Sequence, residues 1–113
     1  VEKAIASSDP DAVIEIKLPW GATTKLKARF FQSLVTVDPV AAISHYSGPL
    51  LVIVGTKDTV VTPQPFAGES FLAYHDGPEG LMVLPTDHAF DAFTGPQTVD
   101  LMAAASLAFI EGN

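Results

Sequence analysis

The sequence predicts an α/β fold built on a parallel sheet. Two short segments, 50–54 ("LLVIV") and 81–84 ("LMVL"), are continuously apolar, which is typical of strands that helices cover on both faces. Helical spacing follows each of them, so the order from residue 50 is strand, loop, helix, strand, loop, helix. The composition agrees with one folded domain over 1–113, because 48% of the residues are hydrophobic and 17% are charged.

The first part of the chain predicts a strand and a helix. Residues 12–18 alternate between apolar and charged side chains, which is the period of a strand with one face in water. The sequence "PWG" at 19–21 ends this strand. Residues 24–35 are predicted to form a helix, because large apolar residues recur at every fourth position. These residues are Leu26, Phe30 and Leu34.

Three further helices are predicted around the two apolar strands. Asp38 and Pro39 fit an N-cap followed by proline in the first turn, and so predict a short helix. A helix is expected over 64–76, between the strands. A last helix is expected over 96–111, with Gly112 placed to cap it. Its inner stripe is expected to comprise Val99, Met102, Ala103, Ser106, Phe109 and Ile110.

Charge and composition exclude several classes of partner and site. The net charge of −7 disfavours nucleic acid and anionic membrane surfaces as partners. The absence of cysteine excludes disulfides, thiolate zinc sites and a cysteine nucleophile within this sequence. No apolar run reaches the roughly 18 residues of a membrane span, and no signal segment opens the chain, so a cytoplasmic location is expected. Because the first residue is Val1, the chain is expected to be processed or part of a longer protein.

Two predicted loops carry the candidate chemistry. The loop 55–61 carries Asp58, and the loop 85–90 carries His88. Both leave the carboxyl ends of predicted strands, where open parallel sheets bind ligands. Neighbouring strands lie about 4.8 Å apart, so an Asp58 oxygen is expected within about 2.6–3.2 Å of His88 Nδ1. Such an acid fixes the histidine tautomer and stabilises its protonated form, although each residue alone also fits a turn former.

The same strings resemble a known family. "GPLLVIVGTKDTVVTPQP", followed by "GLMVLPTDHAF" and an amphipathic helix, resembles the C-terminal part of an α/β-hydrolase. The preceding "FFQSLVTVDPVAAISHYSGP" is similar to the dienelactone-hydrolase and serine-peptidase-like branches. The resemblance implies a C-terminal fragment of an α/β-hydrolase parallel sheet, βαβα with flanking helices. It places the acid strand and loop at 50–61, the histidine strand and loop at 81–90, and the C-terminal helix at 96–111.

The resemblance also implies roles for residues and a class of reaction. Asp58 would be the triad acid and His88 the general base of a serine-type hydrolase. The substrate would be a small molecule or peptide carrying an ester, thioester, lactone or peptide bond. No cofactor is implied. The alternative is a non-catalytic α/β module that self-associates through an exposed sheet edge.

One part of the family pattern is missing. The nucleophile elbow G-x-S-x-G is absent. The nearest string, "GESFL" at 68–72, has Leu72 where glycine is needed and lies between the acid and the histidine, so Ser70 is not expected to be the nucleophile. A missing N-terminal segment would supply it. The 113-residue chain alone is therefore expected to be inactive, and its unpaired sheet edge predicts a homo-oligomer.

A metal site is a weaker hypothesis for the histidine loop. The string "DHAFD" at 87–91, together with Asp58, contains ligand types for a divalent ion. It offers one histidine with hard oxygens and no second histidine nearby, which is a poor zinc set. No metal is therefore predicted.

The remaining histidines and large aromatic residues are given no catalytic role. His45 and His75 lie near predicted helix ends and are interpreted as dipole partners or solvated residues. Trp20 is interpreted as a packing anchor, with contact to substrate as the alternative. Phe90 and Phe93 are expected to pack the histidine loop.

Overall fold

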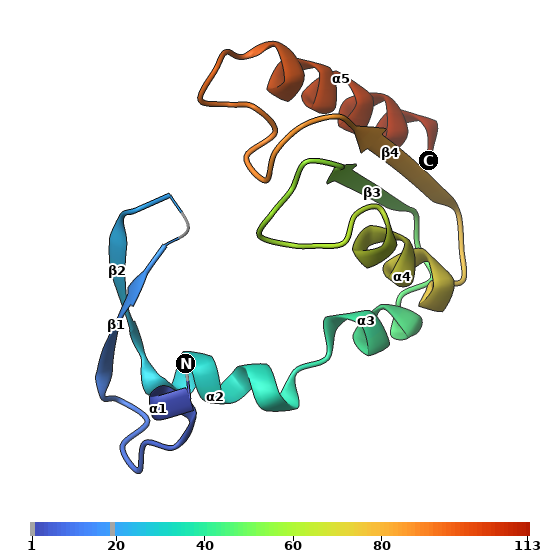
Figure 1. Ribbon diagram of the computed structural model, residues 1–113. Helices are drawn as coiled ribbons and strands as arrows, with labels where there is room; N and C mark the ends of the chain where they lie inside the picture. The colour runs from blue at the N-terminus through green and yellow to red at the C-terminus, as the bar shows by residue number, and fades with distance from the viewer. Residues whose placement is uncertain (1, 19) are drawn as a thin grey trace. The chain divides into compact units, whose positions relative to one another are not determined.

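The computed structural model describes residues 2–18 and 20–113, which form two compact units, Val1–Pro39 and Val40–Asn113. Both units combine helices with a two-stranded sheet (Figure 1). The predicted α/β class is confirmed at this general level. Pro19, in the "PWG" expected to end the first strand, lies outside the described residues.

The first unit is a β-hairpin with short helices at its ends. Its elements are α1 (Glu2–Ile5), β1 (Val13–Lys17), β2 (Thr23–Lys27) and α2 (Ala28–Thr36). The predicted strand is confirmed, and β1 alternates as expected between exposed and half-buried residues. It pairs with β2 in antiparallel register, with Ile14 opposite Leu26 and Ile16 opposite Thr24. Ala28 and Phe31 of α2 are buried.

The predicted helix over 24–35 is wrong in its first part, because residues 23–27 form β2. Gly21 has a φ of +93°, which allows the chain to reverse direction there, and the Leu18 amide donates to the Ala22 carbonyl at 2.7 Å. Pairing with β1 then outweighs the local helical spacing. Two of the apolar residues that suggested the helix, Phe30 and Leu34, are exposed.

The second unit has the predicted order of strands and helices. It contains η1 (Ile43–His45), β3 (Leu50–Gly55), α4 (Phe66–Tyr74), β4 (Glu79–Leu84) and α5 (Gln97–Gly112). The short helix α3 (Pro39–Ala42) begins at the proline, as expected, and precedes η1. Gly112 belongs to α5, and Asn113 is the C-cap in its place.

The two strands of the second unit are parallel and packed between helices. Leu50 is opposite Glu79, and the register continues to Gly55 opposite Leu84. Gly68 of α4 lies directly against Val52 and Val54, whereas Phe109 of α5 lies beside Leu51 and Gly80. Because successive residues of a strand point to opposite faces, α4 and α5 cover opposite faces of this sheet (Figure 1).

Strand β4 is less buried than its apolar sequence predicted. Its residues alternate between exposed and half-buried, and Leu81 and Val83 are 39% and 43% exposed. In the parallel register they lie beside Val52 and Val54, on the face where α4 packs. Helix α4 contacts β3, so the neighbouring strip of β4 remains in solvent.

The last helix is also more exposed than predicted. No residue of α5 is fully buried, and of the expected inner stripe Met102, Ser106 and Phe109 are half-buried while Val99, Ala103 and Ile110 are exposed. Among the described residues, no helix is long and apolar enough to cross a membrane.

Candidate functional site

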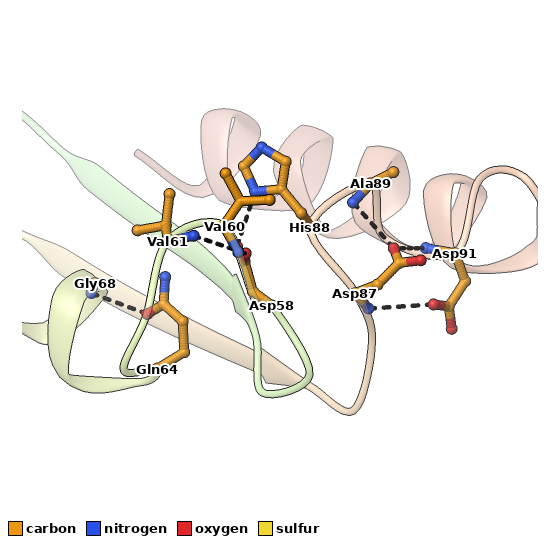
Figure 2. A network of polar contacts seen from close by, with 9 residues as sticks. All are labelled: Asp58, Val60, Val61, Gln64, Gly68, Asp87, His88, Ala89 and Asp91. Carbon is orange, nitrogen blue, oxygen red and sulfur yellow. Dashed lines mark hydrogen bonds and ion pairs between the residues drawn. The ribbon is translucent and has the colours of Figure 1, made fainter. Parts of the chain in front are cut away.

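The structure brings Asp58 and His88 together. Asp58 lies in the loop after β3 and His88 in the loop after β4, at the carboxyl ends of two adjacent parallel strands. Oδ2 of Asp58 lies 2.9 Å from Nδ1 of His88 (Figure 2). The expected distance is therefore confirmed, and the catalytic role of the two residues stays a prediction.

The carboxylate of Asp58 is fixed by its own loop. Its Oδ1 accepts hydrogen bonds from the amides of Val60 at 2.8 Å and Val61 at 2.9 Å. The side chain is only 8% exposed. Burial raises the pKa of Asp58, but the hydrogen bonds from His88, Val61 and Val60 outweigh it, and the pKa lies below its usual value. Asp58 is thus an ionised acceptor with little freedom to turn away from the histidine.

One ring nitrogen of His88, Nδ1, contacts Asp58, and the other, Nε2, is available to a further group. When Nδ1–H donates to Asp58, the neutral ring carries its lone pair on Nε2. Figure 2 shows Nε2 directed away from the carboxylate, and the side chain is 44% exposed. Within the described residues no hydrogen bond involves Nε2. The ring can therefore accept a proton from a group brought to its exposed side.

The histidine loop is built by two other aspartates. Oδ1 of Asp87 accepts from the amides of Ala89 at 3.0 Å and Asp91 at 2.9 Å, while Oδ1 of Asp91 accepts from the Asp87 amide at 3.2 Å (Figure 2). This reciprocal set holds Phe90 and Asp91 at φ values of 54° and 57°. Left-handed backbone is uncommon for a residue such as phenylalanine, so the loop is held in this form by its hydrogen bonds. The turn-forming alternative thus applies to Asp58, which accepts from the Val60 and Val61 amides, and to Asp87, which sets the position of His88.

The two loops meet closely at Gly55, a residue that the sequence patterns did not single out. The amide of Thr56 donates to the Leu84 carbonyl at 2.8 Å, and the amide of Lys57 donates to the Thr86 carbonyl at 2.9 Å. A Cβ atom at Gly55 would collide with the carbonyl oxygens of Thr86 and Asp87. The available signal was a glycine at the end of an apolar strand, which marks a close approach of backbone.

Ser70 lies apart from this arrangement. It is within α4, and its hydroxyl donates to the Ala67 carbonyl at 2.6 Å. The string 68–72 therefore forms helix, where the Gly68 position is needed for packing on β3 and not for a sharp turn. Ser70 lacks the strained strand-to-helix geometry of a nucleophile elbow.

The aspartates of "DHAFD" are occupied with backbone amides. Both Asp87 and Asp91 accept such bonds, and Asp58 accepts two more. Across residues 2–18 and 20–113, no group of three or more His, Asp or Glu side chains is placed to hold a metal ion.

The other singled-out residues differ from their interpretation in part. His75 is buried, with hydrogen bonds on both ring nitrogens, so it is not a solvated residue, whereas His45 is exposed. Trp20 is 61% exposed and Phe93 is 84% exposed, so neither acts as a packing anchor within its unit. Phe90 is half-buried in the histidine loop.

Comparison with known proteins adds no relative. No family model matches the chain, and neither the curated proteins nor the solved structures contain a significant match. The functional argument therefore depends on the geometry of the paired loops.

Proposed function

We propose that this chain is the part of a serine-type α/β-hydrolase that supplies the acid and the general base. The observation that carries the proposal is the 2.9 Å contact between a buried, immobilised Asp58 carboxylate and Nδ1 of a half-exposed His88. Both residues come from the carboxyl ends of adjacent parallel strands, where α/β enzymes place their sites.

In the proposed mechanism, Nε2 of His88 takes the proton of a nucleophilic hydroxyl as its oxygen attacks the substrate carbonyl. The imidazolium that results is stabilised by Asp58, and it gives the proton to the leaving group as the bond between the carbonyl carbon and that group breaks. Water, deprotonated in turn by His88, then hydrolyses the acyl-enzyme, which releases the acid and restores the hydroxyl. The nucleophile and the oxyanion donors come from a segment outside this chain. The substrate is a small molecule or peptide with an ester, thioester, lactone or peptide bond.

A fluorophosphonate probe tests this proposal directly, because it labels an activated serine. We expect the longer protein that contains this sequence to be labelled, and the 113-residue chain to remain unlabelled because Ser70 is a helical residue. In the longer protein, His88→Ala should abolish labelling. The matched control is His45→Ala, which removes an exposed histidine of η1.

Two results would contradict the proposal. The first is stoichiometric labelling of the 113-residue chain, which would mean that one of its own serines, such as the helical Ser70, is the nucleophile. The second is equal loss of labelling in His88→Ala and His45→Ala, which would show a general effect on folding.

A second candidate function is supported by the exposed strip of β4. Leu81 and Val83 leave apolar surface in solvent beside an edge of β4 that pairs with no other strand among the described residues, and such edges pair with other chains. The chain would then act as a self-associating α/β module without catalysis.

A further inference from the structure

A buried histidine lies at the opposite end of the β3–β4 sheet from Asp58 and His88. His75 follows α4 directly, and its side chain is completely buried. Its Nε2 lies 2.7 Å from the carbonyl oxygen of Gly48, which precedes β3. Its Nδ1 lies 3.1 Å from Oε1 of Glu79, the first residue of β4. One imidazole therefore connects the segments that lead into both strands.

The two hydrogen-bond partners of His75 determine how many protons its imidazole needs. The Gly48 carbonyl only accepts hydrogen bonds, and so does an ionised Glu79 carboxylate. A neutral imidazole has a single N–H, so it can satisfy one of these acceptors and must direct a lone pair at the other. Both bonds form when one additional proton lies between Nδ1 and Oε1.

Further contacts fix the position of His75. Its amide donates to the C-terminal carbonyls of Phe71 and Leu72, at the end of α4. The Tyr46 ring lies 5.8 Å away, and its hydroxyl donates to the Pro49 carbonyl. The titratable residues next to His75 along the chain, Tyr74 and Asp76, are exposed, and so is His45 of η1, the 3-10 helix that contacts α4.

We propose that His75 and Glu79 form a proton-dependent clamp at the start of the β3–β4 sheet. The clamp is closed while a proton lies between Nδ1 and Oε1, and it weakens when that proton is released to solvent. Its position explains what it controls: Glu79 is the register partner of Leu50, and the Leu50 amide donates to the Pro78 carbonyl at 2.9 Å. Release of the proton should loosen the first residues of both strands.

The Glu79→Gln variant tests whether the clamp needs the additional proton or only a hydrogen bond between His75 and the side chain at position 79. A glutamine amide can donate to an unprotonated Nδ1, so the variant keeps the contact without the extra proton. The matched control is Glu69→Gln, which removes the same charge from an exposed position on α4. Both variants are compared with the unmodified 113-residue chain.

The first measurement is NMR of the histidine ring nitrogens between about pH 5 and pH 8, the range in which histidines change charge. In the unmodified chain and in Glu69→Gln, His75 should carry protons on both nitrogens at the acid end and lose one as the pH rises. In Glu79→Gln it should carry a single proton, on Nε2, over the whole range. Exposed His45 provides the reference signal.

The second measurement is hydrogen exchange of the Leu50 amide, corrected for the intrinsic effect of pH. Its protection should fall with rising pH in the unmodified chain and in Glu69→Gln, and stay level in Glu79→Gln. A His75 that carries a single proton throughout in the unmodified chain would overturn the clamp. So would the same pH response of Leu50 in all three proteins. The protonation of His75 in the unmodified chain tests the clamp even if a variant fails to fold.

Discussion

Replacing Gly55 with alanine should separate the two loops of the candidate site. A Cβ atom there would lie 2.8 Å from the Asp87 carbonyl oxygen and 2.9 Å from the Thr86 hydroxyl, and closer still to the Thr86 carbonyl oxygen. Ordinary contact begins at 3.4 Å, so the Asp87 carbonyl must retreat by at least about 0.6 Å. If His88 moves with it, its 2.9 Å contact with Asp58 lengthens to about 3.5 Å, beyond a hydrogen bond.

The cost in stability should be that of overpacking, about 1–3 kcal/mol. With a urea dependence of about 2 kcal/mol per molar, the unfolding midpoint should fall by about 0.5–1.5 M. We expect Nδ1–H of His88 to give a low-field NMR signal in the unmodified chain, because it donates to Asp58, and we expect Gly55→Ala to shift or abolish that signal. Urea titration and this signal together measure both effects.

The matched control is Gly112→Ala. It adds the same methyl group where no atom lies within 4 Å, in the last turn of α5. We expect a midpoint equal to that of the unmodified chain or slightly higher, since alanine favours helix. The reasoning is refuted if Gly55→Ala behaves like Gly112→Ala in both measurements.

Three further predictions concern the same unit. Asp58→Asn should keep the fold, because its amide oxygen can still accept from the loop amides. Its NH2 group would face His88 and favour the wrong tautomer, so the turnover of the proposed hydrolase should fall by about 10⁴-fold in steady-state assays. The pKa of Asp58 is lower in the folded chain than its usual 3.8, so its contribution to stability is complete above pH 3.8 and is lost as the pH falls through the lowered pKa. Acid unfolding monitored by circular dichroism should therefore be less steep in Asp58→Asn than in the unmodified chain, and identical curves would contradict this. The chain should form dimers or larger assemblies by light scattering at about 10–50 μM, and Val83→Lys on the exposed face of β4 should reduce them, whereas an unmodified chain that is already monomeric would exclude this edge as an interface.

The parallel strands could be predicted because their signal is local. An unbroken apolar run identifies β3, and the polar residues after each strand identify the ends at which Asp58 and His88 meet. The hairpin could not be separated from a helix in the same way. Leu26 and Thr24 are two positions apart, as on one face of a strand, whereas Leu26 and Phe30 are four positions apart, as on one face of a helix. Spacing alone therefore fits both elements.

The missed features depend on contacts between distant segments. Gly55 is constrained by the Thr86 carbonyl, and His75 is buried because it reaches Gly48, 27 positions earlier in the chain. Exposure of Val83 likewise depends on how far α4 extends over the sheet. Gly55 alone has a local signal, since it is a glycine at the end of an apolar strand. The positions of His75 and Val83 have none, because sequence periodicity does not report contacts between distant segments.

The parallel pairing of β3 and β4 has a consequence for the order of folding. The hairpin β1–β2 is closed by the hydrogen bond from the Leu18 amide to the Ala22 carbonyl, and β-hairpins form in about 1–10 μs. Pairing of β3 with β4 closes a loop that contains the whole crossover between them, including α4. Contacts between residues so far apart in the chain form more slowly than a hairpin. Asp58 and His88, 30 positions apart, become neighbours only through that event. On a ribosome, Asp58 and His88 would therefore meet only after the β4 segment has left the exit tunnel, so translation itself delays the contact between them.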